Sequence, residues 1–392
     1  MPHFGDFQLE IYLAGVEGRV PPLPMTAEGM EAAAREVLSE EAFGYIAGAA
    51  GTESTARANR AAIEQWHIVP RMLRSVVARD LTTEVCGTVL PAPVLLAPIG
   101  VLGIAHPEAE LAAARAASGV GVPMILSTVS SIPLEQVAAQ LAAAGGTGWF
   151  QLYWPKDLEV ARSLVGRAER AGFGAIVVTL DTWALAWRPR DLRLAYLPML
   201  RGLGIANYLT DPAFRAGLAR APEDDPKSAI LHWAATFGNP ALSWADIAWL
   251  RSQTTLPILV KGVCHPDDAR AAVDAGVAGL VVSNHGGRQV DGARPALDCL
   301  PDVAAVAAAA GVAVLFDSGI RSGSDVVKAV ALGARAVLLG RPYVYGLAVA
   351  GAEGVVHVLR SLLGELDLSL ALAGHTDLGS LGPEVLVRAP AR

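Results

Sequence analysis

Two side chains that can bind an anion and move its proton stand three residues apart in the chain. His285 and Arg288 flank two glycines in the run 283–289 (Ser-Asn-His-Gly-Gly-Arg-Gln), directly after the apolar segment 278–282. Such a segment predicts a buried β-strand, with the histidine and the arginine at its end. A base beside a fixed cation suits an enzyme that acts on a small hydroxy acid, although a polar turn with a solvated arginine has the same composition.

From residue 92 onward, short apolar runs alternate with alanine-rich segments of helical length. The runs cover residues 93–97, 123–127, 148–153, 175–181, 257–261, 279–283, 313–317 and 336–339. Eight strands that are each followed by a helix predict an α/β fold, the (β/α)8 TIM barrel. A doubly wound sheet is the alternative, but no Gly-x-Gly-x-x-Gly turn follows the first strand.

The remaining segments are expected to complete one domain over residues 1–392. Residues 1–90 form an N-terminal helical extension with helices over 27–38 and 40–46, residues 91–365 form the barrel, and residues 366–392 form a C-terminal tail. Helix starts are predicted at 265–268 and 322–325, and Gly333 is expected to end the second of these helices. The connection 182–243 is far longer than an ordinary strand-to-helix loop, which indicates a lid, an oligomer contact, or both.

Composition narrows the classes of partner. The net charge is −7, the isoelectric point is near 5.7, and no cluster of basic residues predicts binding to nucleic acid. The stretch most like a membrane span, residues 88–105, is interrupted by prolines and glycines, which predicts a strand and loop instead. Asp6 and Glu10 interrupt any signal peptide, so a cytoplasmic protein is expected. Cys86, Cys264 and Cys299 are widely spaced, which predicts neither disulfides nor a metal site.

Polar residues collect at the predicted carboxyl ends of the strands, where barrel enzymes place their active sites. Arg321 and Arg341 follow the seventh and eighth strands, a frequent phosphate site of this fold. Lys261 ends a strand and suits either a Schiff-base nucleophile or a fixed charge beside an electron sink. Asp181 ends another strand and is placed to orient His285.

These motifs resemble the FMN-dependent L-2-hydroxy-acid oxidizing family. The matching runs are 283–289, 317–321 (Asp-Ser-Gly-Ile-Arg), 340–342 (Gly-Arg-Pro), 151–153 (Gln-Leu-Tyr) and 259–262 (Leu-Val-Lys-Gly), in order over nearly the whole chain. Within the family, the segments 5–12, 70–73, 187–191 and 207–212, together with the long connection, resemble the lactate 2-monooxygenases. The resemblance implies FMN as the cofactor and no metal.

The resemblance also implies roles for individual residues. His285 is expected to be the catalytic base with Asp181 behind it, and Tyr153 is expected to hydrogen-bond the substrate. The substrate carboxylate is expected to meet Arg288, Tyr45 and Arg188. The residues expected to contact FMN are Pro98, Ile99, Gly100, Ser127, Gln151, Thr179, Lys261, Ser283, Asp317, Gly319, Arg321, Gly340 and Arg341. Ser318 departs from the family pattern, in which glycine is usual at this position.

The implied partners are a small 2-hydroxy acid and O2, and the family's habit implies a homotetramer. For a lactate 2-monooxygenase, L-lactate and O2 give acetate, CO2 and water. An oxidase would instead release the keto acid and hydrogen peroxide, and a dehydrogenase would pass the electrons to another acceptor. A flavin-binding barrel without turnover is the alternative outside catalysis, and the presence of a base, an orienting carboxylate and an anion clamp argues against it.

Overall fold

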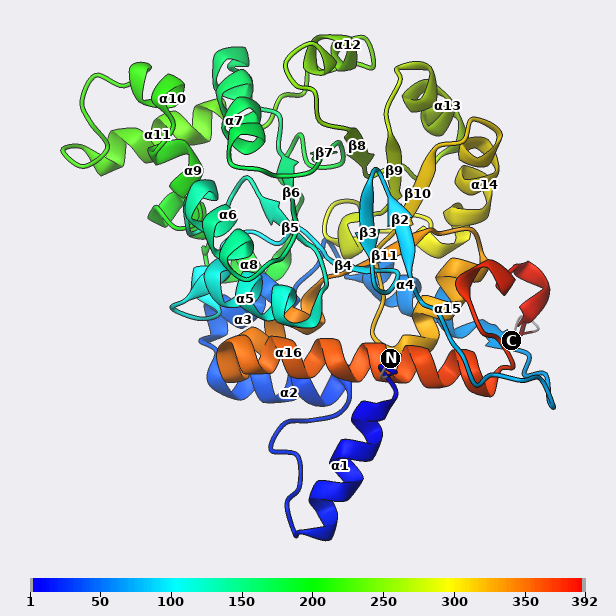
Figure 1. The fold of residues 1–392 in the computed structure, drawn as a ribbon. Helices are drawn as coiled ribbons and strands as arrows, with labels where there is room; N and C mark the ends of the chain where they lie inside the picture. Colours follow the sequence, from blue (N-terminus) through cyan, green and yellow to red (C-terminus); the bar gives the residue numbers. More distant parts are fainter. Residues whose placement is uncertain (1–2, 390–392) are drawn as a thin grey trace.

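A closed barrel of eight parallel strands forms the centre of the computed structural model, which describes residues 3–389 (Figure 1). Strands adjoin in chain order, and the barrel closes between β11 and β4. The strands are β4 (Val94–Leu96), β5 (Met124–Ser127), β6 (Gly148–Leu152), β7 (Ile176–Thr179), β8 (Ile258–Lys261), β9 (Gly279–Val282), β10 (Ala313–Phe316) and β11 (Ala336–Leu339). All eight predicted strands are present, so the TIM barrel is confirmed and the doubly wound alternative is wrong.

Both faces of the barrel strands are buried. Trp149, Val177 and Leu259 belong to the apolar cluster inside the barrel, whereas Phe150 and Val178 belong to the larger cluster beneath the helices. Successive side chains of a strand point to opposite faces, so a strand covered on both sides is apolar throughout. Polar side chains are therefore concentrated at the carboxyl ends of the strands and just beyond them.

A short hairpin covers the amino-terminal end of the barrel. Strands β2 (Thr83–Val85) and β3 (Thr88–Leu90) pair in antiparallel fashion, and Val85 and Leu90 join the cluster inside the barrel. The Trp149 indole N–H donates to the Thr88 hydroxyl at 3.0 Å. This hairpin was not predicted from the sequence, and it leaves the carboxyl end of the barrel for ligands.

Helices surround the barrel as the alternation predicts (Figure 1). Both predicted helix starts are confirmed: His265 caps α13, and Ser322 with Asp325 forms a capping box at the start of α15. The second of these helices ends near Gly333, as expected. The helices that follow the strands are α5 (Ala109–Val120), α6 (Leu134–Ala143), α7 (Leu158–Arg170), α12 (Asp246–Arg251), α13 (Pro266–Asp274), α14 (Ala296–Ala309), α15 (Gly323–Ala331) and α16 (Arg341–Leu372).

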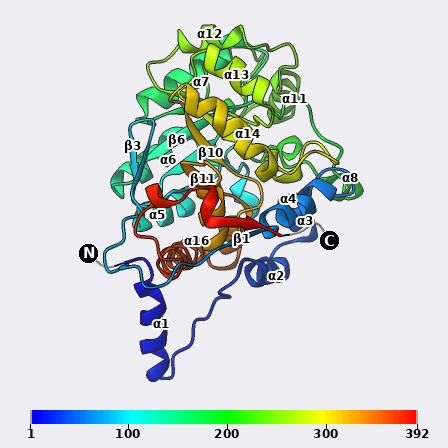
Figure 2. The same cartoon turned by 90° about the vertical axis from the view of Figure 1, so that its right-hand side faces the viewer.

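The N-terminal extension contributes α1 (Asp6–Val16), α2 (Ala27–Val37), α3 (Glu40–Ala47) and α4 (Ser54–Glu64). The predicted helices over 27–38 and 40–46 are confirmed as α2 and α3, whereas α1 and α4 were not predicted. Helix α2 lies along α16, and α1 projects away from the body of the molecule in both views (Figures 1 and 2). None of the residues of α1 is buried.

The end of the N-terminal extension meets the C-terminal segment on the outside of the barrel. Strand β1 (Trp66–Ile68) pairs with β12 (Leu386–Arg388), so the end of the extension is fastened to the last described residues. Helix α16 bends at Gly351 and continues past residue 365 before it ends at Leu372. Among residues 3–389, no helix is both long and apolar enough to cross a bilayer.

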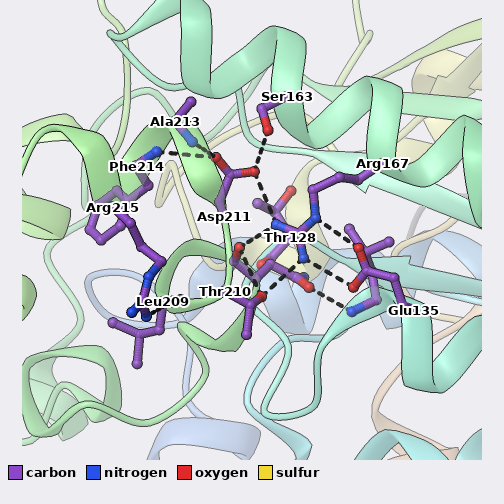
Figure 3. Close-up of polar contacts among 12 residues, drawn as sticks. Thr128, Glu135, Ser163, Arg167, Leu209, Thr210, Asp211, Ala213, Phe214 and Arg215 are labelled. Atoms are coloured by element: carbon purple, nitrogen blue, oxygen red, sulfur yellow. Dashed lines mark hydrogen bonds and ion pairs between the residues drawn. The ribbon is translucent and has the colours of Figure 1, made fainter. Parts of the chain in front are cut away.

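The connection 182–243 is folded rather than extended. It contains α8 (Pro189–Arg193), η2 (Pro198–Arg201), α9 (Ala206–Leu209), α10 (Pro212–Ala216) and α11 (Pro226–Thr236). Arg167 of α7 holds its middle part in place (Figure 3). The guanidinium donates twice to Glu135, at 2.8 and 3.0 Å, and once each to Asp211, at 3.0 Å, and to the Asn207 carbonyl, at 2.8 Å.

Asp211 is fully buried and depends on this arginine for its countercharge. Its second carboxylate oxygen accepts the backbone N–H groups of Ala213 and Phe214 and so caps α10. A buried carboxylate is tolerated where it is paired and hydrogen-bonded. Arg167 and Asp211 together therefore join the long connection to the helical ring of the barrel.

Replacing Arg167 by alanine is expected to lower the free energy of unfolding by about 3 kcal/mol, because Asp211 would remain buried without a countercharge. Denaturant unfolding of the holoenzyme measures this loss. Arg162→Ala on the same helix is the control, since Arg162 and Glu159 form an exposed pair that is expected to contribute about 0.5 kcal/mol. Equal losses in the two variants would contradict the anchoring role of Arg167.

Candidate active site

A cavity lies at the carboxyl end of the barrel strands. The predicted site residues that line it are Tyr45, Pro98, Ile99, Gly100, Tyr153, Arg188, Lys261, His285, Arg288, Asp317, Gly319, Arg321, Gly340 and Arg341. The other predicted residues lie behind its wall, hydrogen-bonded to one another or to residues of the lining: Ser127, Gln151, Thr179, Asp181 and Ser283. The structure thus brings together residues from all eight strand ends, α3 and the long connection.

His285 and Asp181 form a hydrogen-bonded pair across the barrel mouth. The imidazole Nδ1 lies 2.8 Å from a carboxylate oxygen of Asp181, and the Thr182 hydroxyl donates to the same oxygen at 3.0 Å. An ionised carboxylate only accepts hydrogen bonds, so this contact assigns the proton to Nδ1. The other ring nitrogen, Nε2, is left to accept a proton from a ligand.

Electrostatics keep the two groups in the protonation states that a base requires. Burial lowers the pKa of His285 below its usual range, and attraction to Asp181 opposes this effect only in part. Burial acts against ionisation of Asp181, but attraction to His285 and Lys261 outweighs it and lowers the pKa of the carboxyl. At neutral pH the pair is therefore a neutral imidazole beside a carboxylate.

Two arginines and a tyrosine form the wall that suits a carboxylate. The guanidinium groups of Arg288 and Arg188 lie 5.2 and 5.4 Å from the centre of the Tyr45 ring. Arg288 donates to the backbone oxygens of Tyr45 at 2.7 Å and Gly48 at 2.6 Å, so its position is fixed from the carboxyl end of α3. Burial and the nearby Arg188 and Arg341 lower the pKa of Arg288 to about 10, which leaves it cationic at neutral pH.

Tyr153 supplies a phenol to the same cavity. Its ring meets Phe237 of the long connection edge-on, with ring centres 5.4 Å apart. Burial, and secondarily the charge of Asp181, raises the pKa of Tyr153 above its usual range. The hydroxyl therefore keeps its proton and can donate a hydrogen bond.

A polar layer fixes the orientation of one amide beneath the cavity. The Ser127 hydroxyl donates to the Gln151 side-chain oxygen at 3.0 Å, and the Gln151 nitrogen donates to the Thr179 hydroxyl at 2.9 Å. These three residues occupy the adjacent strands β5, β6 and β7. Since both ends of the amide are engaged, Gln151 presents a fixed edge.

Lys261 is a buried cation at the end of β8. Its ammonium donates to the Ser283 hydroxyl at 2.8 Å and pairs with Asp317 at 3.1 Å. Burial lowers the pKa of Lys261, but Asp317 and Asp181 more than compensate and raise it above its usual range. A Schiff-base nucleophile needs a neutral amine, so the geometry favours the fixed charge over the nucleophile.

Two further arginines converge where the sequence predicts a phosphate site. Arg321 follows β10 and Arg341 follows β11, and both line the cavity beside Gly319 and Gly340. Burial and the proximity of Arg341 lower the pKa of Arg321. Within residues 3–389, neither arginine lies within salt-bridge distance of a carboxylate, so this end of the cavity is suited to an anionic group.

With this geometry, the relation to known proteins is clear. The sequence pattern of FMN-dependent dehydrogenases matches residues 34–388. The chain belongs to this family. FMN-dependent alpha-hydroxy acid dehydrogenase qulF of Penicillium citrinum is 44% identical over 376 residues, which are 95% of this chain and 93% of that protein. L-lactate oxidase of Lysinibacillus sphaericus (strain C3-41) is 44% identical over 368 residues, 94% of each chain.

The solved structures agree with the family. A structure of mandelate oxidase with (S)-4-hydroxymandelic acid has a TM-score of 0.83 and 40% identity, and the match covers 94% of this chain and 100% of that chain. The predicted family and its cofactor are thereby confirmed. The chain is an FMN-dependent oxidoreductase that acts on 2-hydroxy acids.

The residues present fit FMN. Arg321 and Arg341 can hold the phosphate, because they are close together and lack carboxylate partners among the described residues. Lys261 offers a fixed positive charge deeper in the cavity, and Pro98, Ile99 and Gly100 form a wall of small or apolar groups. A Cβ on Gly100 would lie 2.4 Å from the Val129 side chain, so the close approach of these segments requires glycine.

Several cavity residues were not predicted from the sequence. Leu185, Met199 and Phe237 belong to the long connection and line the cavity, but apolar residues in such a segment carry no motif. Thr182 directly follows a predicted catalytic carboxylate, and this adjacency was the available signal. Ser318 was noted only as a departure from the family pattern, whereas its hydroxyl proves to have three partners.

For oxidation of a 2-hydroxy acid, kcat/KM is expected to rise with pH and to level off, with a midpoint below about 6.5. Below that midpoint His285 is protonated and cannot accept a proton, so the rate falls by about tenfold per pH unit. Anaerobic reduction of the flavin by substrate measures this dependence. A midpoint above 7 would remove His285 from its role as the base.

The variant His285→Gln is expected to remain yellow and folded, while reduction of its flavin by substrate slows by about a hundredfold or more. Near-normal reduction in this variant would also remove His285 from its role.

Arg321→Ala is expected to weaken FMN binding by about tenfold or more, because a charge-assisted contact to the phosphate would be lost. Fluorescence titration of the apoprotein with FMN measures the dissociation constant. Arg335→Ala is the matched control, since Arg335 lies exposed just before β11, at the opposite end of the barrel from the cavity. Equal FMN affinity in the two variants would argue against a phosphate site at Arg321.

Proposed function

We propose that the protein oxidises a small L-2-hydroxy acid, in the first place L-lactate, with O2 as the second substrate. The observation that carries the proposal is the meeting, in one cavity, of a neutral base at His285 and a carboxylate clamp at Arg288 and Tyr45. A 2-hydroxy acid presents both groups that this pair recognises, a carboxylate and an adjacent carbon that bears a hydroxyl.

Each side chain has a distinct task in this reaction. Arg288, Tyr45 and Arg188 hold the substrate carboxylate, and Tyr153 donates a hydrogen bond to the substrate oxygen. Nε2 of His285 accepts a proton from the substrate, and Asp181 stabilises the imidazolium that results. FMN, held by the cavity residues described above, would supply the acceptor for the two electrons that leave the α-carbon.

The fate of the keto acid depends on whether it leaves before it meets peroxide. Four residues of the connection 182–243 line the cavity, which favours retention of the product: Leu185, Arg188, Met199 and Phe237. We propose that this connection acts as a lid and that the chemistry is of the lactate 2-monooxygenase type. Pyruvate and hydrogen peroxide would then react in place, so that L-lactate and O2 yield acetate, CO2 and water.

An oxidase is the second candidate, and the names of the relatives favour it. L-lactate oxidases and mandelate oxidases are among the proteins most similar to this chain. An oxidase has the same base, clamp and cofactor site and differs in the order of release. Keto acid and hydrogen peroxide then leave separately, in equal amounts.

Aerobic incubation of the purified yellow protein with L-lactate tests both candidates. Acetate with little free peroxide is expected from the monooxygenase, because the covered cavity retains the keto acid until it is decarboxylated. Pyruvate with an equal amount of peroxide would establish the oxidase instead. Acetate, pyruvate and peroxide are assayed together, and catalase is added in a parallel sample so that decarboxylation in solution is not mistaken for decarboxylation in the site.

Two controls limit the interpretation. Anaerobic incubation with L-lactate is expected to bleach the flavin without acetate formation, because O2 is required for the second step. Failure of L-lactate to reduce the flavin would contradict L-lactate as the substrate. The same assay with an aromatic 2-hydroxy acid such as (S)-mandelate would then show whether the cavity takes a larger side chain.

A further inference from the structure

Ser318 links the carboxylate of Asp317 to the loop that carries His285. Its hydroxyl donates to Asp317 at 2.7 Å and accepts the backbone N–H groups of Asn284 at 3.2 Å and Gly286 at 3.0 Å. A serine hydroxyl has one proton to donate and two lone pairs to accept with. All three are used, so the direction of each hydrogen bond is determined.

Both ends of this link have a backbone conformation that side chains disfavour. Ser318 has a φ of 84° and His285 a φ of 58°, and Gly286 and Gly287 continue in the left-handed region. Left-handed backbone at a residue other than glycine is retained only where its surroundings hold it. The two N–H groups that Ser318 accepts lie on either side of His285, and they are part of what holds this loop.

Lys261 completes the hydrogen-bond network around the His285 loop. Lys261 donates to the Ser283 hydroxyl at 2.8 Å, and the same oxygen accepts the backbone N–H of His285 at 3.0 Å. Lys261 also pairs with Asp317 at 3.1 Å, and Asp317 accepts the Ser318 hydroxyl. The hydroxyls of Ser283 and Ser318 therefore accept three consecutive backbone N–H groups, those of residues 284, 285 and 286. Ser283 is hydrogen-bonded to Lys261 directly, and Ser318 is connected to it through Asp317.

We propose that Ser318 is a positioning residue for the base. Its hydroxyl holds the left-handed turn at His285 and so keeps Nε2 directed into the cavity while Nδ1 stays on Asp181. Through Asp317 it also couples this turn to the part of the cavity that binds the cofactor. The proposal rests on the proposed role of His285 as the base, and it adds a residue that acts through the backbone of the loop carrying this base.

Two variants distinguish the effect of the Ser318 hydroxyl from the effect of its left-handed backbone conformation. Ser318→Ala and Ser318→Gly both remove the hydroxyl, but glycine relieves the left-handed backbone whereas alanine does not. If the hydroxyl positions the base, flavin reduction slows by about tenfold in both variants, because misplacement of a catalytic group reduces the rate without preventing binding. The glycine variant is nevertheless expected to melt at a higher temperature than the alanine variant.

Two further measurements distinguish positioning from a general structural effect. The dissociation constant of oxalate, a carboxylate that lacks the hydrogen to be removed, is expected to be unchanged in both variants, because Arg288 and Tyr45 are intact. Amide hydrogen exchange in a peptide spanning 283–289 is expected to speed up in both, because two N–H groups lose their acceptor. Ser324→Ala is the control, since the only hydrogen-bond partner of that hydroxyl within residues 3–389 is the Ser322 hydroxyl.

The outcomes are decisive in each direction. Wild-type reduction rates and wild-type exchange in Ser318→Gly would overturn the proposal, and an effect confined to Ser318→Ala would assign the role to the backbone alone. Slower reduction that follows loss of FMN would also overturn it. If no 2-hydroxy acid reduces the wild-type flavin, the proposed function fails, and the exchange data still decide whether Ser318 holds the loop.

Discussion

The concentration of positive charge at one end of the barrel is the constraint on which the site depends. Lys261, Arg188, Arg288, Arg321 and Arg341 all line one cavity, although the chain as a whole carries a net charge of −7. Of these five cations, only Lys261 and Arg188 are paired with carboxylates of the described residues. The carboxyl end of α3 offers partial compensation, because its backbone oxygens accept hydrogen bonds from Arg288 and Arg341. The remaining charge is suited to two anions, the cofactor phosphate and the substrate carboxylate.

The barrel and much of the cavity could be predicted because their signals are local. An apolar run that ends in a polar residue predicts a buried strand and places the polar side chain at the carboxyl end of the barrel. Lys261 and Asp181 are examples. Parallel strands then bring these ends together without further information. The specific assignment of FMN required more, namely the family motifs at 283–289 and 317–321.

The features that could not be predicted depend on contacts between distant segments. The β2–β3 hairpin is recognised only by the barrel interior that it covers, and nothing in residues 83–90 shows which end of the barrel it closes. The role of Ser318 depends on two N–H groups more than thirty residues away along the chain. Met199 and Phe237 line the cavity only because of the path that the long connection takes. The contact between Arg167 and Asp211 holds this connection in place.

The pairing of β1 with β12 bears on how the molecule is made. Trp66 lies opposite Arg388, so β1 cannot form its hydrogen bonds until β12 has been synthesised. During synthesis on the ribosome, the barrel strands emerge well before β12, and β1 remains an open edge until residues 386–388 have emerged. Contacts of such high sequence separation form late and slow folding. A nascent or C-terminally shortened chain therefore exposes an unpaired strand, and chaperones and proteases would be expected to act on the protein at that point.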